Sequence, residues 1–369
     1  MRPEHGGQLR GSRHRSAGDG VWLDFSVNLN PYAPQPADSE WLAWRDDIAK
    51  YPAPTSRSVD QLLESYLGVS ESGWVISTQG AMEALKLALG FQGGRTIHIP
   101  VPCFSEYVFL CEQLGLDYRT HVISERGWIN GRSWLNMEVD QGGAVLFGNP
   151  NNPFGVSVSI EDLLPILCHF RENNVMVIVD EAFIEFTKTP QEYSLISILK
   201  DFPNVMIAGS LTKSWSIPGI RLGYLVSADC QSIEILRNRQ ITWPLNSIVH
   251  GWATSMLVEA RVAGQRAGMR RLQETKEQLF ASLQGFSFLR VYPSDANYRV
   301  CECLFQMDEM IGFLGSQQIG VRLCDSIPGL PAGRFIRIGA GLPEHNRRLI
   351  QALTAFASLI AEESHRKAE

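Results

Sequence analysis

Lys213 stands where a reactive amine would be useful. It follows the apolar run V-M-I-A-G-S, with Ser210 three residues before it and Arg221 eight residues after it. A lysine at the carboxyl end of a strand can form a Schiff base with an aldehyde if its pKa falls below the ordinary value of about 10.4. Ser210 and Arg221 would offer a hydroxyl and a two-pronged cation to a phosphate group. A single lysine is far more often a solvated charge, so this interpretation needs support from residues at the same edge of the sheet.

Two more polar residues follow runs that are typical of strands. Asp180 ends V-M-V-I-V-D, which reads as buried on both faces. An unpaired carboxylate in such a place is costly, so Asp180 needs a fixed cationic partner, and a protonated ring nitrogen would serve. Asn152 lies in F-G-N-P-N-N-P-F-G, whose two Asn-Pro steps predict a rigid turn. The segment is either a turn and nothing more, or a turn whose amide donates to a ligand oxygen.

A possible anion site and a possible aromatic platform complete the set. Gly80 opens the helical run A-M-E-A-L-K-L-A-L, where free backbone N–H groups can bind an anion. The signal is weak alone, because many glycines merely start helices, and the lysine and hydroxyl of a nucleotide-binding loop are missing. Phe104, in P-C-F-S-E-Y, is placed to stack on a flat ring, with Tyr107 as the alternative.

Taken together, these groups fit pyridoxal 5′-phosphate. This cofactor needs an amine for its aldehyde (Lys213), a counter-ion for its pyridinium nitrogen (Asp180) and a donor to its phenolic oxygen (Asn152). The protein would position the cofactor and tune its electronics. The expected phosphate cradle consists of Gly80, Ala81, Met82, Ser210 and Arg221.

The surrounding sequence predicts the elements that must position these residues. From about residue 60, short β-branched runs alternate with helical segments, which predicts an α/β domain with a mostly parallel sheet covered by helices. Ligands of such sheets bind at the carboxyl ends of the strands. A long helical stretch over 246–284, broken near Gly264, then leads into a smaller α+β domain. We expect an N-terminal arm (1–40) joining the small domain, a large cofactor-binding domain (41–245), and a connector helix with the small domain (246–369).

The composition narrows the class of protein. The 33 basic and 39 acidic residues give a formal charge of −6, so the chain lacks the broad basic field that non-specific nucleic-acid binding requires. No apolar run approaches the about 20 residues that span a bilayer, and the polar start lacks the core of a secretory signal. We therefore expect a cytoplasmic protein without nucleic-acid or membrane partners.

The seven cysteines are scattered, which is typical of reduced thiols rather than of a disulfide framework. Cys301 and Cys303 would share one face of a strand, but no further ligand has suitable spacing nearby. We expect no metal site.

The motifs resemble a known superfamily. N-P-N-N-P-F-G, then D-E-A-F, then S-L-T-K with an arginine eight residues later is similar to the fold-type I pyridoxal-phosphate enzymes of the class I/II aminotransferase superfamily. The resemblance implies that Tyr51, in K-Y-P-A-P, reaches the cofactor phosphate of a partner subunit. It thus implies a homodimer with shared active sites. Arg337, in F-I-R-I, would bind the substrate carboxylate.

Within the superfamily, further motifs resemble the L-threonine-O-3-phosphate decarboxylases of cobalamin biosynthesis. They are H-G-G at 5–7, D-F-S-V-N-L-N-P at 24–31, and two arginines flanking I-P-G-L. The resemblance implies decarboxylation of L-threonine O-3-phosphate to 1-amino-2-propanol O-2-phosphate through a Schiff base on Lys213. The implied substrate-binding residues are His5, Asn30, Arg322 and Arg337.

The alternative is an aminotransferase of the histidinol-phosphate type acting on a phosphate-bearing amino substrate. Those enzymes share the scaffold but usually carry tyrosine where this chain has Phe183, which cannot donate to the phenolic oxygen. The G-A-G-L after Arg337 departs from the decarboxylases, which often carry another basic residue there. The bond that breaks must stand perpendicular to the pyridine ring, so the pose of the substrate carboxylate decides between the reactions. A non-catalytic scaffold is disfavoured, because it would not need Asp180 beside a poised lysine.

Overall fold

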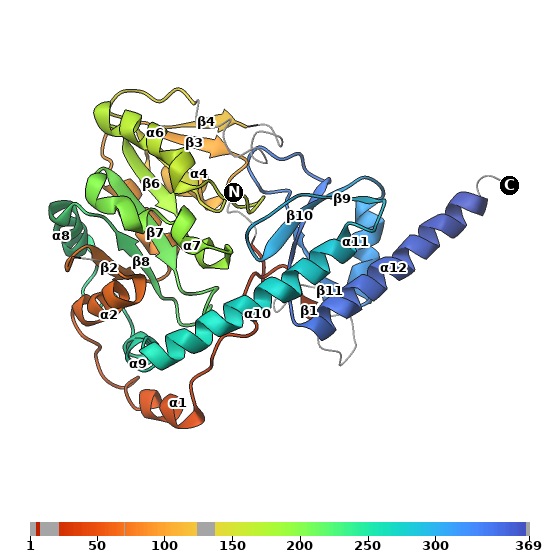
Figure 1. Cartoon of the computed structure of the whole chain (residues 1–369), viewed down its shortest axis with the longest axis horizontal. Coiled ribbons are helices and arrows are strands. Elements are labelled where there is room, and N and C mark those ends of the chain that lie inside the picture. Colours follow the sequence, from red (N-terminus) through yellow and green to blue (C-terminus); the bar gives the residue numbers. More distant parts are fainter. Residues whose placement is uncertain (1–4, 8–21, 70, 124–136, 367–369) are drawn as a thin grey trace.

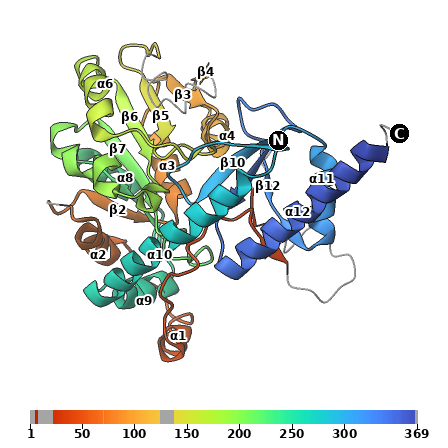
Figure 2. The same ribbon diagram turned by 45° about the vertical axis from the view of Figure 1, so that its right-hand side comes forward.

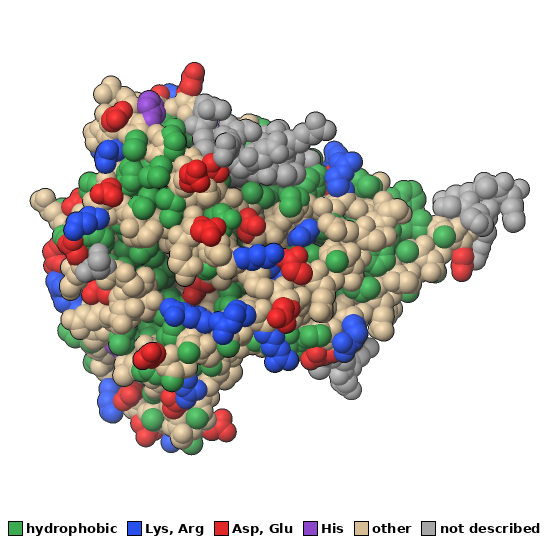
Figure 3. All heavy atoms as spheres, in the orientation of Figure 1, with side chains coloured by type: hydrophobic (Ala, Val, Ile, Leu, Met, Phe, Trp, Pro, Cys, Tyr) green, Lys and Arg blue, Asp and Glu red, His purple; other side chains and the backbone are tan. Residues whose placement is uncertain are grey.

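The computed structural model describes residues 5–7, 22–69, 71–123 and 137–366. Two lobes lie side by side in Figure 1, and the long helix α10 runs from one to the other. In Figure 2 the last helix, α12, lies on the side of the small lobe that faces away from the large sheet. Figure 3 shows acidic and basic side chains interspersed over one face, in keeping with the formal charge of −6. In the described part of the chain, no helix is long and apolar enough to cross a membrane.

The large lobe is built on a seven-stranded sheet of order β2-β8-β7-β6-β5-β3-β4. Every neighbouring pair is parallel except the two pairs that β8 makes, so the predicted mostly parallel α/β sheet is confirmed. The strands are β2 (Val75–Thr78), β3 (Ile97–Val101), β4 (Tyr118–Val122), β5 (Ala144–Gly148), β6 (Met176–Asp180), β7 (Val205–Ser210) and β8 (Gly223–Val226).

Helices cover both faces of this sheet, which explains the continuous apolar runs of its central strands. Alternate residues of β7 go to opposite faces: Val205 and Ile207 join one core cluster, and Met206 and Ala208 join another. The first cluster includes side chains of α2 (Arg57–Leu67), α6 (Ile160–Glu172) and α9 (Ser247–Met256). The second includes side chains of α3 (Ala81–Gly90), α4 (Glu106–Leu114) and α8 (Cys230–Arg239). Shorter elements are α1 (Asp38–Arg45), η3 (Ile184–Phe186), α7 (Pro190–Tyr193) and η4 (Leu195–Asp201).

The small lobe has an antiparallel sheet of order β12-β13-β10-β9, as expected of an α+β unit. The N-terminal arm adds to this lobe, because its strand β1 pairs in parallel with β11. The elements are β1 (Leu23–Asp24), β9 (Leu289–Val291), β10 (Tyr298–Cys303), α11 (Met307–Ser316), β11 (Ile319–Gly320), β12 (Arg322–Leu323), β13 (Phe335–Gly339) and α12 (Pro343–Arg366).

The connector differs from the expectation at two points. The helical stretch breaks between α9 and α10 (Glu259–Leu283), at the extended residue Val258, whereas Gly264 lies inside α10. A Cβ at Gly264 would meet only Pro34, at 4.0 Å, so nothing there requires a break. The helix α9 also packs with the large lobe: Trp252 lies edge-on to Trp215, with 5.3 Å between ring centres. The core of the large lobe therefore extends beyond the expected boundary at 245.

Candidate active site

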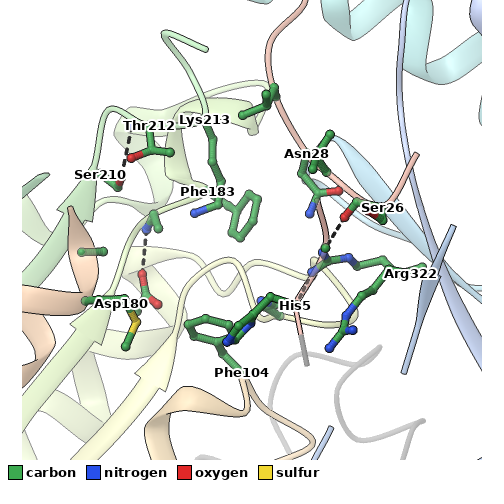
Figure 4. Close-up of a pocket in the computed structure, with 18 of the residues that line it drawn as sticks. His5, Ser26, Asn28, Phe104, Asp180, Phe183, Ser210, Thr212, Lys213 and Arg322 are labelled. Carbon is green, nitrogen blue, oxygen red and sulfur yellow. Dashed lines mark hydrogen bonds between the residues drawn. The ribbon is translucent and has the colours of Figure 1, made fainter. Parts of the chain in front are cut away.

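A cavity of about 320 Å³ lies at the carboxyl ends of β6 and β7, between the large lobe, the arm and the small lobe. In Figure 4, Asp180, Ser210 and Lys213 lie on one side of the cavity, and Ser26, Asn28 and Arg322 on the other. Parallel strands deliver their last residues to one edge of the sheet, which is why positions far apart in the sequence meet here. The predicted site residues that line it are His5, Ala81, Met82, Phe104, Asn152, Asp180, Ser210, Lys213, Arg221, Arg322 and Arg337.

The carboxylate of Asp180 is held at the end of β6. Its Oδ1 accepts the backbone N–H of Ala182 at 2.9 Å, and its Oδ2 accepts the hydroxyl of Tyr107 at 2.8 Å. Burial raises the pKa of Asp180, while the charge of Lys213 and the two hydrogen bonds act in the opposite direction. A cationic ring nitrogen placed against this carboxylate would relieve the cost of burying it.

Tyr107, the expected alternative to Phe104 for stacking on the cofactor ring, lies outside the cavity. It is buried beneath the cavity, where its hydroxyl supports Asp180, and it does not line the pocket. Phe104 does line the pocket, with its ring edge-on to Tyr107 at 5.7 Å, so of these two residues Phe104 is the one that can stack on a ring in the cavity. A Cβ at Gly148 would come within 2.9 Å of the Tyr107 hydroxyl, so the glycine that ends β5 leaves room for this contact.

Lys213 contributes its amine to the wall of the cavity. Its Nζ lies 4.3 Å from the centre of the Phe183 ring. Burial lowers the pKa of Lys213 to about 8; Asp180 raises it, and Arg337 and Arg221 lower it further. The uncharged amine, which is the form that attacks a carbonyl, is therefore far more populated near neutral pH than it would be at the ordinary lysine pKa.

Asn30 lies outside the cavity, contrary to its expected contact with substrate. Its backbone N–H donates to the carbonyl of Lys213 at 2.9 Å, and its Nδ2 donates to the carbonyl of Ser214 at 2.9 Å. Asn30 thus fastens the arm to the loop that carries Lys213. Asn28 lines the cavity instead, and its buried Oδ1 has no hydrogen-bond partner among the described residues. The sequence could not separate the two, because both belong to the same polar motif.

An anion cradle forms where α3 begins. Gly80 and Arg221 both have positive φ, 77° and 67°. A Cβ at Gly80 would lie 2.6 Å from Nη2 of Arg221, and one at Gly223 would lie 2.7 Å from the backbone nitrogen of Ala81. These glycines let the guanidinium approach the N-terminus of α3, where the helix dipole also favours negative charge.

Thr212 belongs to the same wall and was missed by the sequence analysis. It lines the cavity, and its buried Oγ1 has no hydrogen-bond partner within the described residues. The neighbouring Ser210 accepts the backbone N–H of Thr212 at 3.2 Å. The signal available in the sequence was a second hydroxyl directly before Lys213.

Arg322 and Arg337 face each other directly across the antiparallel pair β12–β13. Each is more than nine-tenths buried, so neither is a surface ion-pair residue. Nη2 of Arg322 donates to the hydroxyl of Ser326 at 3.0 Å. Nη1 of Arg337 donates to Oδ1 of Asn152 at 2.8 Å, and its guanidinium lies 4.8 Å from the ring centre of Tyr298. Because arginine only donates, Asn152 must present its oxygen to Arg337, which leaves Nδ2 to donate to a ligand.

The arm contributes His5, and Tyr51 lies elsewhere. Nε2 of His5 is 2.6 Å from a carboxylate oxygen of Glu106, and its ring lies beside Phe104 in Figure 4. Tyr51 is 81% exposed and packs on Trp243, with ring centres 4.7 Å apart, at a separate surface pocket. It does not reach the cavity of its own chain.

The groups around the cavity fit pyridoxal 5′-phosphate. An amine with a lowered pKa, a buried carboxylate and a helix N-terminus with its arginine match the aldehyde, the ring nitrogen and the phosphate. The orphaned hydroxyl of Thr212, together with Ser210, offers further donors beside the cradle. Fold and pocket together define a fold-type I pyridoxal-phosphate enzyme.

The profile of the aminotransferase class I and II family matches residues 21–353, so the chain belongs to this family. It is 31% identical to a threonine-phosphate decarboxylase of Salmonella typhimurium over 92% of either chain. It is 25% identical to a histidinol-phosphate aminotransferase of Methanocaldococcus jannaschii over 91% of this chain and 89% of that one. The crystal structure of the histidinol-phosphate aminotransferase from Clostridium acetobutylicum has the same fold, with a TM-score of 0.79 at 24% identity, over 91% of this chain and 99% of that one.

Proposed function

We propose that this enzyme decarboxylates L-threonine O-3-phosphate to 1-amino-2-propanol O-2-phosphate. The observation that carries the proposal is the pair of buried arginines, Arg322 and Arg337, on adjacent strands facing the cofactor cavity. Basic side chains of Lys213, Arg221 and this pair line the cavity, and Asp180 supplies the one carboxylate that the described residues place on its wall. We assign Arg221 to the cofactor's phosphate and the buried pair to the two anionic ends of the substrate.

Two residues of the arm favour a phosphate-bearing substrate. His5 and Asn28 line the same cavity as Arg322, so their side chains can contact a distal phosphate bound to that arginine. The carboxylate can then stand perpendicular to the cofactor ring rather than being clamped in its plane. The 31% identity to a threonine-phosphate decarboxylase also favours this reaction.

Pyridoxal phosphate supplies the electron sink that makes a bond at the substrate's Cα labile. The residues around the cavity would determine which bond at Cα breaks, because they orient the substrate relative to the cofactor ring. Asp180 would hold the cofactor's ring nitrogen in its protonated form, and Nδ2 of Asn152 would donate to the phenolic oxygen, a contact that Phe183 cannot make. Loss of carbon dioxide from Cα would require a proton to take its place, and Nζ of Lys213 in its ammonium form would donate that proton, so the net reaction consumes one proton from solvent.

The assay that tests the proposal resolves the products. Purified enzyme loaded with cofactor is incubated with O-phospho-L-threonine, with and without 2-oxoglutarate. We expect carbon dioxide and 1-amino-2-propanol O-2-phosphate in equal amounts, independent of the keto acid. Formation of a keto acid only when 2-oxoglutarate is present, with no carbon dioxide, would establish the aminotransferase instead.

The chain is further proposed to act as a cytoplasmic homodimer. Exposed apolar side chains lie beside Tyr51, because Ile48 and Trp243 line the same surface pocket. Exposed apolar clusters of this kind favour a second protein surface. All seven cysteines are free thiols, as a reducing compartment would keep them.

A further inference from the structure

The side chain of Lys276 is buried within the connector helix α10, where the two lobes meet. It is 2% exposed, although lysine is rarely buried without a partner. Its ammonium donates to three backbone carbonyls, at 3.2 Å to Phe186, 2.7 Å to Asp295 and 3.1 Å to Ala296. All three N–H groups are thus satisfied by main chain, and no carboxylate hydrogen-bonds to this ammonium in the described structure.

The first of these carbonyls belongs to the segment that follows β6. Phe186 lies in η3, and its backbone N–H donates to the carbonyl of Phe183 at 3.0 Å. Phe183 lies under Nζ of Lys213, three residues after Asp180. Gln273, one turn before Lys276 on α10, donates to the same carbonyl of Phe186 at 2.6 Å. One end of the Lys276 contact therefore holds the segment that carries Asp180 and Phe183.

The other two carbonyls belong to the loop between β9 and β10. This loop hydrogen-bonds to the turn that carries Asn152. Oδ2 of Asp295 accepts the backbone N–H of Ser157 at 2.8 Å, and its own N–H donates to the carbonyl of Gly155 at 2.8 Å. A Cβ at Gly155, whose φ is +74°, would collide with the hydroxyl of Ser294. The turn and the loop are thus in direct backbone contact.

We propose that Lys276 is a positioning residue, whose ammonium ties the Asp180–Phe183 segment to the Asn152 turn across the seam between the lobes. The two groups that flank the cofactor ring, the carboxylate of Asp180 and the amide of Asn152, belong to different loops, and Lys276 fixes the distance between those loops. The inference concerns the cofactor site and holds for either reaction.

Physical chemistry favours this role over mere packing. Burying a cation costs free energy, and an apolar side chain of similar length would stabilise the same position better if filling space were its only task. The cost shows in the pKa of Lys276, which burial lowers to about 8, with Lys188 and Arg299 lowering it further and Glu277 and Asp295 raising it. Nζ of Lys276 hydrogen-bonds to three carbonyls from two separate segments, and an apolar side chain cannot make these bonds.

The test compares Lys276→Met with Leu279→Ala, a buried apolar substitution on the same helix whose side chain cannot hydrogen-bond to either segment. In cofactor-free protein, measured by hydrogen exchange, Lys276→Met should speed exchange at residues 151–157 and 183–187, while Leu279→Ala should leave these segments no faster than the rest of the chain. In the loaded enzyme, Lys276→Met should weaken cofactor binding and lower kcat, each about 10-fold, with KM nearly unchanged. Exchange that rises uniformly in both variants, or unchanged cofactor affinity and kcat, would overturn the proposal.

A second variant covers the case in which Lys276→Met does not fold. Asp295→Ala keeps the ammonium but removes the acceptor for the N–H of Ser157. It should speed exchange at 155–157 only and weaken cofactor binding by a similar factor. If Asp295→Ala binds the cofactor as the wild type does, the link from Lys276 to Asn152 does not exist. Where both variants fold, their effects on cofactor binding should be less than additive, because they break one chain of contacts.

Discussion

At the scale of single residues, the environment of Lys213 determines its reactivity. The side chain is surrounded by Phe183, Asp180 and two arginines, and burial is the largest influence on its pKa of about 8. Burial and the arginines disfavour the ammonium, while Asp180 alone favours it. The net effect is a pKa of about 8, which lies within the pH range of ordinary enzyme assays.

The rate at which cofactor-free enzyme captures pyridoxal phosphate should therefore rise with pH and level off above about 8. The pKa of Lys213 in the folded protein lies below the ordinary lysine value of 10.5, so the reactive neutral amine accumulates as the pH passes through 8 rather than through 10.5. Stopped-flow absorbance between pH 6 and 9.5 measures this. Borohydride should then fix the cofactor to Lys213, and Lys213→Ala should lack the visible band. A capture rate that still climbs steeply above pH 9 would show that the amine is not depressed.

We propose that Arg322 and Arg337 determine which substrate the enzyme uses. Arg322→Ala should lower kcat/KM for O-phospho-L-threonine by about 100-fold, because a buried guanidinium that pairs with an anion contributes strongly to binding. The same variant should affect unphosphorylated threonine far less. Arg337→Ala should impair both substrates, since its guanidinium also orients Asn152, and it should let some keto acid form. Kinetics on both substrates with products resolved provide the measurement. Small and equal losses for both substrates in both variants would remove the pair from the site.

At the scale of elements, the start of α3 shows how a backbone turn forms an anion site. Gly80→Ala should weaken cofactor binding by about 10-fold or more, because the new Cβ lies 2.6 Å from the Arg221 guanidinium and φ is +77°. Gly90→Ala is the matched control, since Gly90 belongs to the same helix and a Cβ there meets nothing within 4 Å. The control should bind cofactor normally and be slightly more stable. Titration of cofactor into both apo variants separates them, and equal affinities would contradict the cradle.

The sequence predicted the buried strands well. It predicted poorly the exposed edge strand and the features that depend on tertiary packing. Strands β5, β6 and β7 are buried on both faces, so their apolar runs identify them. The edge strand β4 is half exposed and polar, Y-R-T-H-V, and it carries no such run. The break before α10 follows from how α9 packs on the large lobe, which no local pattern encodes. Asn28 and Asn30 are a further case, because tertiary contacts alone decide which asparagine faces the cavity.

At the scale of the whole molecule, Tyr51 lies too far from the cavity of its own chain to complete the proposed active site there. Tyr51 is four-fifths exposed and turned away from its own cavity, beside a surface pocket that also contains Ile48 and Trp243. An isologous dimer would place the same patch on both protomers, so that each could offer a tyrosine to the other's cofactor phosphate. The apolar residues around Tyr51 would then be covered.

Mixing two inactive variants tests this assembly. Lys213→Ala chains lack the amine, and Tyr51→Ala chains lack the proposed cross-subunit contact. If Tyr51 acts across the interface, a hybrid dimer contains one site with the intact Lys213 of one chain and the intact Tyr51 of the other. Random exchange makes half of the dimers hybrids with one good site each, so activity should return to about one quarter of the wild-type value.

The control is a mixture of Lys213→Ala and Asp180→Asn chains. Its hybrid dimers also combine two different defects, one in each chain. Because both of those defects lie in the cavity of their own chain, each hybrid site keeps one of them, and no activity should return. A fully active monomer, or a Tyr51→Ala mixture as silent as the control, would contradict the shared site.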